Sequence, residues 1–173
     1  DHLEAAPTLS DYFKGKELSK VVVVSPDVGG TARARKFAGR LKKPIAIIDK
    51  YRASDTSVEI MHIVGSVKGR TAIIVDDMID TAGSVIKGSQ AVLNAGAKEV
   101  YVCATHPVFA GPARGRLEKY WKEGLFKEVV VTDTIPTPEE KRLPCIKILS
   151  VAALFAESIK RIHGNMSISA LFR

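Results

Sequence analysis

Six short apolar runs place the strongest constraint on how this chain can fold. They are rich in β-branched residues and show no alternation of polar and apolar side chains, so both faces of each strand must be covered. The runs are Lys20–Ser25, Ile45–Asp49, Thr71–Val75, Val100–Ala104, Glu128–Thr132 and Ile146–Ser150. Strands of this kind predict a buried, largely parallel sheet.

Helical patterns lie between these strands. Thr31–Leu41 carries basic residues on one side and apolar residues on the other, and Ser84–Asn94 has apolar residues at helical spacing before Gly96. Two further helices are expected at residues 114–122 and 152–163. The alternation predicts an α/β doubly wound domain whose mainly parallel sheet has about five to six strands. The polar stretch Tyr51–Thr56 has no period and is expected to form a mobile loop.

The charge balance favours a small anionic ligand. A chain of 173 residues with 46% hydrophobic content suits one compact domain, and 26 Lys and Arg against 19 Asp and Glu give a net charge of +7. Aromatic residues are only 6% of the chain and no basic block contains them, so a nucleic-acid surface is not expected. The partners expected are therefore phosphorylated metabolites or nucleotides, or an acidic subunit surface.

The cysteines and the apolar segments favour a cytoplasmic protein. Cys103 and Cys145 lie far apart without metal-ligand spacing, which is typical of buried free thiols in a reducing compartment. No apolar stretch reaches the length of about 18 residues that a membrane span needs, and no signal pattern opens the chain. We therefore expect neither a membrane nor a nucleic acid among the partners.

The segment IIVDDMIDTAGS, residues 73–84, crowds three acids into one turn of a basic protein. Its second part, Asp80–Ser84, lies between a strand and a helix, where free backbone N–H groups and the helix dipole favour an anion. Small side chains allow a phosphate to approach, and the hydroxyls of Thr81 and Ser84 add donors. The alternative is that Asp80 or Thr81 only caps the helix.

A helix cap does not explain the adjacent carboxylates of Asp76 and Asp77. Two unit charges about 4 Å apart near a surface repel by about 4 kcal/mol, so the acids need partners. Vicinal hydroxyls of a sugar, or a divalent cation that carries a second phosphate, would supply them. An acid pair beside a phosphate site suits a phosphorylated sugar.

Two other loops are expected at the same edge of the sheet, beyond the carboxyl ends of the strands. Gly29 and Gly30 in SPDVGG allow close approach of a diphosphate, and Asp27 offers an oxygen ligand to Mg²⁺. Lys50 and Arg52 fit cations that cover a transferring phosphoryl group. If each is considered separately, the glycines are consistent with a purely structural turn, and Lys50 and Arg52 with ordinary surface charges. The Walker and dinucleotide motifs GxxxxGK[ST] and GxGxxG are both absent from the sequence.

These motifs resemble a known family. DDMIDTAGS is similar to the phosphoribosyl-diphosphate binding motif of type I phosphoribosyltransferases and ribose-phosphate diphosphokinases. The segments VVVVSPDVGGTARA, IAIIDKYR, CATHPVFAGPA and SISALF resemble the diphosphokinases specifically, and the resemblance runs from Asp1 to Arg173. It implies a type I phosphoribosyltransferase-like fold. It also implies transfer of a diphosphoryl group from Mg-ATP to the 1-hydroxyl of ribose 5-phosphate, giving AMP and phosphoribosyl diphosphate for nucleotide biosynthesis.

The resemblance also implies roles for individual residues. The 5-phosphate would bind at Asp80, Thr81, Ala82, Gly83 and Ser84, the ribose hydroxyls at Asp76 and Asp77, and Mg²⁺ at Asp27 in the loop Ser25, Pro26, Asp27, Val28, Gly29, Gly30. Lys50 and Arg52 would be catalytic, with Arg52 also touching ribose 5-phosphate. Ser167 and Ser169 resemble part of a regulatory phosphate site. Tyr51 replaces a residue that is often charged in this family, which implies a different loop charge.

The resemblance covers only the second of the family's two similar halves. Residues 1–173 are therefore expected to be one domain, the C-terminal half of a two-domain enzyme, with residues 1–19 as the passage between halves and the N-terminal half absent. Such a half binds ligands but is expected to have little activity alone. The family forms dimers that build hexamers. The alternatives are a phosphoribosyltransferase that consumes the diphosphate, and a non-catalytic ligand-binding fragment or regulatory subunit.

Overall fold

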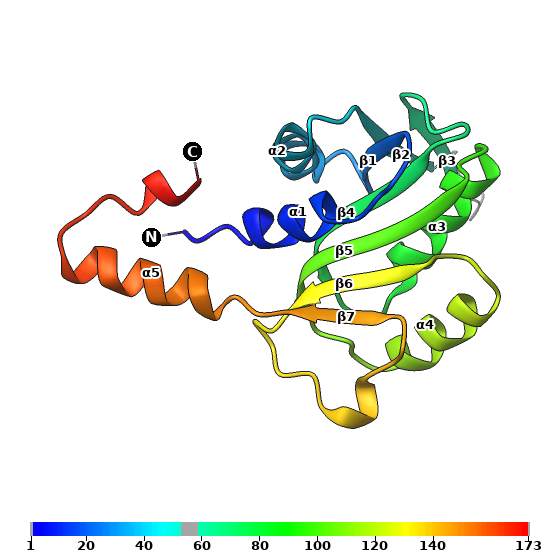
Figure 1. Ribbon diagram of the computed structural model, residues 1–173. Coiled ribbons are helices and arrows are strands. Elements are labelled where there is room, and N and C mark those ends of the chain that lie inside the picture. The colour runs from blue at the N-terminus through cyan, green and yellow to red at the C-terminus, as the bar shows by residue number, and fades with distance from the viewer. Residues whose placement is uncertain (1, 53–58, 173) are drawn as a thin grey trace.

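The chain forms one seven-stranded sheet with helices on both faces (Figure 1). The computed structural model describes residues 2–52 and 59–172, with the backbone alone described at 51, 52, 59 and 60. The strand order is β3-β2-β1-β4-β5-β6-β7, and all neighbours are parallel except β2 and β3. The strands are β1 (Val21–Ser25), β2 (Ile45–Arg52), β3 (Glu59–Val64), β4 (Thr71–Ile79), β5 (Glu99–Pro107), β6 (Glu128–Thr132) and β7 (Ile146–Leu149).

Two pairs of helices build two separate cores. Helices α1 (Ala6–Lys14) and α2 (Thr31–Leu41) contribute Leu9, Phe13 and Phe37 to one core, and α3 (Gly83–Asn94) and α4 (Ala113–Lys122) contribute Val92 and Leu117 to the other. Helix α5 (Ala152–His163) extends away from the sheet (Figure 1). Two short 3₁₀ helices, η1 (Glu139–Lys141) and η2 (Ser169–Phe172), complete the described elements.

Strand β1 shows why an uninterrupted apolar run is needed. Val21 and Val23 face the core under α1 and α2, whereas Val22 and Val24 face the core under α3 and α4. All four side chains are buried. Because successive residues of a strand point to opposite faces, a strand covered on both sides needs an apolar residue at every position.

The predicted doubly wound fold is confirmed, but the predicted number of strands was wrong. All six predicted strands are present, and the seventh strand is β3, which pairs antiparallel with β2. On β3, Met61 and Ile63 pack toward the core while His62 and Val64 are exposed. A strand at the edge of the sheet is covered on one face only, so it lacks the continuous apolar run that marks the other strands.

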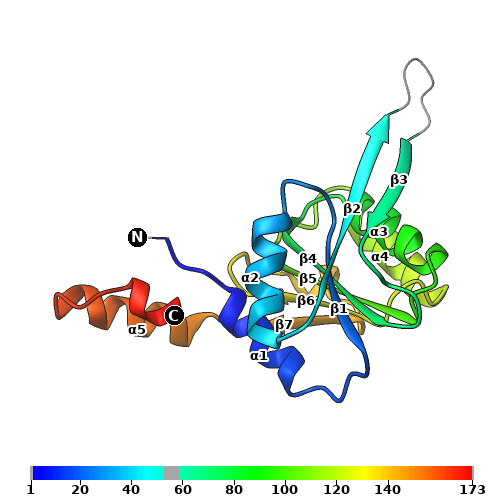
Figure 2. The ribbon, with the colours of Figure 1, turned by 90° about the horizontal axis from the view of Figure 1, so that it is seen from above.

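Two residues of the expected loop after the second strand belong to the strand itself. Tyr51 and Arg52 are the last residues of β2, which with β3 forms a two-stranded ribbon that projects from the body (Figure 2). Residues 53–56 of that expected loop lie outside the described residues. Residues 1–19, expected to be a passage between halves, contain helix α1, which packs on the sheet.

Other expectations concern the cysteines and the membrane. Cys103 and Cys145 are both free and buried, as predicted. Burial raises the pKa of Cys145 to about 11, so its thiol stays protonated near neutral pH. No helix in the described part of the chain is long and apolar enough to cross a membrane.

Candidate functional site

The candidate site lies where the chain leaves two adjacent central strands in opposite directions. The chain passes from β1 to α2 on one face of the sheet, and from β4 to α3 on the other face. Such a change of direction opens a crevice beyond the carboxyl ends of the two strands, which is where open α/β sheets bind ligands. The two loops at this point are SPDVGG and the segment that follows the acid pair Asp76 and Asp77.

The first loop, Ser25–Gly30, is called here the diphosphate loop. The Ser25 hydroxyl donates a hydrogen bond to the Asp27 carbonyl (2.7 Å), and the Gly30 N–H donates to Asp27 Oδ1 (2.7 Å). A Cβ at Gly30 would lie 2.8 Å from Ser25 Oγ, so the closed turn requires glycine at this position. Pro26 is buried, whereas Asp27, Val28 and Gly29 are exposed.

The donor set at Asp27 fits one mode of Mg²⁺ binding. The described residues contain no group of three or more His, Cys, Asp or Glu side chains that could hold a metal ion. The carboxylate of Asp27 is exposed, and the Gly30 N–H engages only one of its oxygens. Mg²⁺ commonly keeps several waters and binds through one or two carboxylates together with substrate phosphates. Asp27 therefore fits a metal that arrives with a phosphorylated ligand.

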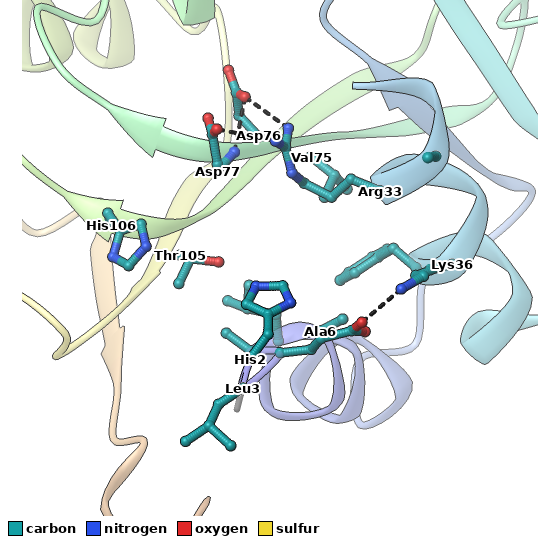
Figure 3. Close-up of a pocket in the computed structure, with 15 residues that line it drawn as sticks. His2, Leu3, Ala6, Arg33, Lys36, Val75, Asp76, Asp77, Thr105 and His106 are labelled. Carbon is teal, nitrogen blue, oxygen red and sulfur yellow. Dashed lines mark hydrogen bonds and ion pairs between the residues drawn. The ribbon is translucent and has the colours of Figure 1, made fainter. Parts of the chain in front are cut away.

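The acid pair has a partner that the sequence analysis missed. Strand β4 continues to Ile79, so Asp76 and Asp77 are strand residues, and Arg33 of α2 reaches both of them (Figure 3). Arg33 Nη1 lies 3.1 Å from Asp76 Oδ1, and Arg33 Nη2 lies 3.0 Å from Asp77 Oδ2. The Arg33 guanidinium is thus a partner of both acids, a role for which the sequence analysis expected sugar hydroxyls or a metal ion. Its position on a helix with several basic residues gave no signal that separated it from Arg35 or Lys36.

The two carboxyls have opposite ionisation behaviour. Burial raises the pKa of Asp76 to about 6, and the neighbouring Asp77 carboxyl adds to the increase, while the Asp77 N–H and Arg33 oppose it. Burial also acts to raise the pKa of Asp77, but the hydrogen bond with Asp76 and the charge of Arg33 outweigh it and bring that pKa below its ordinary value. The pair therefore holds one proton more readily than two isolated carboxylates would, and Asp76 is the residue that carries it.

The segment Asp80–Ser84 is called here the cradle, and it is not closed by a side-chain cap. The residue before α3 is Ala82, whose φ of 62° is left-handed, and no side chain caps the helix. The alternative interpretation, that Asp80 or Thr81 only caps the helix, is therefore wrong. Within the described part of the chain, the N–H groups of residues 80–84 meet no hydrogen-bond acceptor. Free amides at a helix start, beside small residues and the exposed side chains of Thr81 and Ser84, suit an oxyanion.

A cavity of about 390 Å³ adjoins the acid pair (Figure 3). Residues 2–6, helix α2 and the ends of β4 and β5 line it, with His2, Lys36 and His106 among its polar residues. His106 Nδ1 is 2.9 Å from the hydroxyl of Thr134, which fixes the orientation of the imidazole. The sequence analysis did not select His106, because a lone histidine at a strand end carries no motif.

The structure does not bring every predicted residue to this place. Of the predicted residues whose side chains the structure describes, only Asp76 and Asp77 line the cavity, whereas the diphosphate loop, the cradle and Lys50 do not. Lys50 is half-buried in β2 opposite Met61. Arg52 ends the same strand, and its side chain is not among the described ones. Ser167 and Ser169 lie beyond α5, with their hydroxyl oxygens 3.0 Å apart, and Arg161 Nη1 donates to the Ser167 carbonyl (3.0 Å).

The match to known proteins is extensive. A family model described as phosphoribosyl synthetase-associated domain matches residues 56–173. A ribose-phosphate pyrophosphokinase of Caldanaerobacter subterraneus subsp. tengcongensis is 56% identical over 99% of this chain, which covers 54% of that protein. The crystal structure of phosphoribosylpyrophosphate synthetase from Mycobacterium smegmatis matches with a TM-score of 0.84 and 38% identity, over 95% of this chain and 52% of that chain.

A more distant structure shares the fold alone. The adenine phosphoribosyltransferase of Trypanosoma brucei matches with a TM-score of 0.53 and 20% identity, over 80% of this chain and 67% of that chain. The chain spans about half the length of the curated relatives it matches. Given 56% identity over almost its whole length and a matching family model, the chain belongs to the ribose-phosphate pyrophosphokinase family.

Proposed function

We propose that the protein transfers the diphosphoryl group of Mg-ATP to the 1-hydroxyl of ribose 5-phosphate. The observation that carries this proposal is the placement of the acid pair and the cradle at the carboxyl end of β4. The oxygen of the 1-hydroxyl forms a bond to the β-phosphorus of ATP, the bond from that phosphorus to the bridging oxygen of the α-phosphate breaks, and AMP leaves. The hydroxyl proton is released, and the other product is phosphoribosyl diphosphate.

The cradle and the acid pair would hold the two ends of ribose 5-phosphate. The N–H groups of Asp80, Thr81, Ala82, Gly83 and Ser84, together with the exposed hydroxyls of Thr81 and Ser84, would bind the 5-phosphate. Asp76 and Asp77 would accept hydrogen bonds from the ribose hydroxyls. Arg33 supports this role, because it holds both carboxylates on one side while each oxygen retains lone pairs for further donors.

The diphosphate loop and β2 would act on the transferring group. The loop residues Ser25, Pro26, Asp27, Val28, Gly29 and Gly30 would lie along the diphosphate, with Asp27 as the residue that holds Mg²⁺. When bound, Mg²⁺ neutralises phosphate charge and orients the oxygens. Lys50 and Arg52 would stabilise the charge that develops on the transferring group.

The complete enzyme would need more than this chain. The chain covers 54% of a relative that is 56% identical to it, which supports the proposal that residues 1–173 act as the C-terminal half of a two-domain enzyme. We extend the proposal to a homo-oligomer, from dimer to hexamer, and to a regulatory phosphate at Ser167 and Ser169. Light scattering of the complete gene product would test the first, and titration with inorganic phosphate of a Ser167→Ala variant the second.

Product analysis tests the activity. The complete gene product is incubated with ribose 5-phosphate and Mg-ATP, and chromatography is used to follow AMP. AMP that appears only in the presence of ribose 5-phosphate is the expected result. Base-dependent release of diphosphate from phosphoribosyl diphosphate, without AMP, would instead identify a phosphoribosyltransferase. Ligand binding without either reaction would identify a regulatory subunit.

Calorimetry tests the binding half of the proposal on this chain directly. Ribose 5-phosphate is titrated into the unaltered chain and into a variant that carries Asp76→Asn and Asp77→Asn. We expect the variant to bind more weakly, because two acceptors for the ribose hydroxyls lose their charge. Unchanged affinity would show that the acid pair does not hold the sugar.

A further inference from the structure

A segment after β5 holds the outer side of the cradle. This segment, Phe109–Arg116, is called here the strap. The N–H of Phe109 donates to the Ile79 carbonyl (2.9 Å), and the N–H of Ala110 donates to the Asp80 carbonyl (3.0 Å). Arg116 Nη1 donates to the next carbonyl, that of Thr81 (3.1 Å). Three consecutive carbonyls of the cradle region are thus turned toward the strap.

The direction of these carbonyls fixes the direction of the cradle's amides. In a trans peptide, the C=O of one residue and the N–H of the next point in opposite directions. No peptide bond of the described residues is cis. With the carbonyls of Ile79, Asp80 and Thr81 turned toward the strap, the N–H groups of the three residues that follow them point away from it. These are among the amides that meet no acceptor in the described part of the chain.

The conformation of Ala82 favours rotation of the last of these peptides, the one between Thr81 and Ala82. Its φ of 62° places a non-glycine residue in the left-handed region, which costs about 1–2 kcal/mol relative to the ordinary conformation. Rotation of the Thr81–Ala82 peptide would relieve that cost, but it would turn the Thr81 carbonyl toward the anion and the Ala82 N–H away from it. The hydrogen bond from Arg116 holds this carbonyl in place, and a charged donor makes such a bond stronger than a neutral one.

We infer that Arg116 is a positioning residue for sugar-phosphate binding, which acts by keeping the Thr81 carbonyl turned away so that the Ala82 amide faces the 5-phosphate. The inference rests on the proposed function, because it names how that function's phosphate site is held open. Arg116 lies in the first turns of α4, 35 residues beyond Thr81, and its side chain is exposed. The core does not require it, so its contact with Thr81 serves the cradle.

Arg114 provides a matched control on the same helix. It is exposed like Arg116, and its Nε donates to the backbone carbonyl of Glu140 (2.7 Å), which is outside the cradle. The variants Arg116→Met and Arg114→Met remove the same charge and the same type of bond to a backbone carbonyl, and Arg114→Met also removes an ion pair with Glu118 (3.0 Å). Calorimetric titration of the chain with ribose 5-phosphate compares them, and urea unfolding checks that both variants remain folded.

We expect Arg116→Met to weaken ribose 5-phosphate binding about tenfold, the effect of a lost charge-assisted hydrogen bond, while Arg114→Met changes it by less than about twofold. Ala82→Gly supplies a second readout, because glycine adopts the left-handed conformation without the cost that drives the peptide to rotate. In the Ala82→Gly background, Arg116→Met should weaken binding by only about threefold or less. A role of Arg116 in folding alone would not produce this difference.

The outcomes separate the inference from the proposed function. Ribose 5-phosphate binding that is equal in the unaltered chain and in Arg116→Met overturns the inference and leaves the proposed function standing. An equal loss in Arg114→Met also overturns it, since net charge would then be the cause. If Arg116→Met weakens binding as much in the Ala82→Gly background as in the unaltered chain, the explanation by peptide rotation is overturned. If the unaltered chain does not bind ribose 5-phosphate, the proposed function fails and the inference fails with it.

Discussion

Replacing Asp76 by asparagine is expected to stabilise the folded chain above about pH 6 and to leave its stability nearly unchanged below about pH 4. The side chain of Asp76 is only 18% exposed. Burial raises its pKa from 3.8 to about 6, and Arg33 offsets only part of that increase. Asparagine has nearly the same shape and no charge to bury, so it escapes the cost of ionisation.

The sign and the size follow from proton linkage. Between about pH 4 and pH 6 the folded chain holds a proton at Asp76 that the unfolded chain has lost, so the contribution of Asp76 to stability falls as the pH rises through this interval. Each tenfold change in an ionisation constant corresponds to about 1.4 kcal/mol, which makes the full effect about 3 kcal/mol. The variant also loses the contact between Arg33 and Asp76, so this value is an upper limit.

Urea unfolding at several pH values measures the effect. The quantity of interest is the free energy of unfolding of Asp76→Asn minus that of the unaltered chain, which should rise from near zero at about pH 4 toward 3 kcal/mol at about pH 7.5. Asp49→Asn, at an exposed position of β2, is the control and should show no comparable rise. A difference that does not vary with pH, or an unaltered chain that is the more stable at about pH 7.5, would refute the reasoning.

Three other perturbations address the proposed catalysis, the attachment of α1 and the turn before β4. Lys50→Ala in the complete gene product should lower kcat far more than the affinity for ribose 5-phosphate, because its contact strengthens in the transition state; equal losses in steady-state kinetics would make it a binding residue. Glu128→Gln should cost about 1–3 kcal/mol in urea unfolding, since Glu128 accepts from the Tyr12 hydroxyl (2.8 Å) and pairs with Lys16 (3.0 Å); an unchanged midpoint would show that α1 is held by its apolar side chains alone. Gly65→Ala should lower the thermal midpoint by several degrees, because Gly65 has a φ of +106° and a Cβ there would lie 3.0 Å from a backbone oxygen of β2; an unchanged midpoint would show that the turn adapts.

The central part of the fold was predictable because its physical signal is local. Strands β1, β4 and β6 are covered on both faces and need continuous apolar runs, and helix α2, which packs on the sheet, has the predicted bounds Thr31–Leu41. Helix α5, outside the sheet, also has its predicted bounds, Ala152–His163. Strand β3 and helix α1 were not predicted. Strand β3 is covered on one face only, so its pattern is weaker than that of a strand inside the sheet.

The candidate site was predictable only in its outline. The acids and glycines of the two loops have unusual spacing, which the sequence displays directly. Arg33 and Arg116 gave no such signal, because each lies on a helix with several other basic residues. Their selection depends on where the folded chain places them, 43 residues from Asp76 for Arg33 and 35 residues from Thr81 for Arg116. Ala82 was predicted as a phosphate-site residue, but its left-handed conformation was not, since that conformation is a property of the backbone and not of the residue type.

Arg33 joins the helix that follows the diphosphate loop to the acid pair. It is in α2, which begins directly after the diphosphate loop, and its Nη1 would lie 3.4 Å from a Cβ at Gly30. The same nitrogen contacts Asp76 at 3.1 Å, so the helix that follows the diphosphate loop is joined to the acid pair by an ion pair. The pKa of Asp76 is about 6, and the charge of Arg33 lowers it, so the ionisation of Asp76 depends on how close Arg33 remains. A phosphorylated ligand that draws Arg33 away from Asp76 would therefore raise the pKa of the carboxyl that is proposed to hold the ribose.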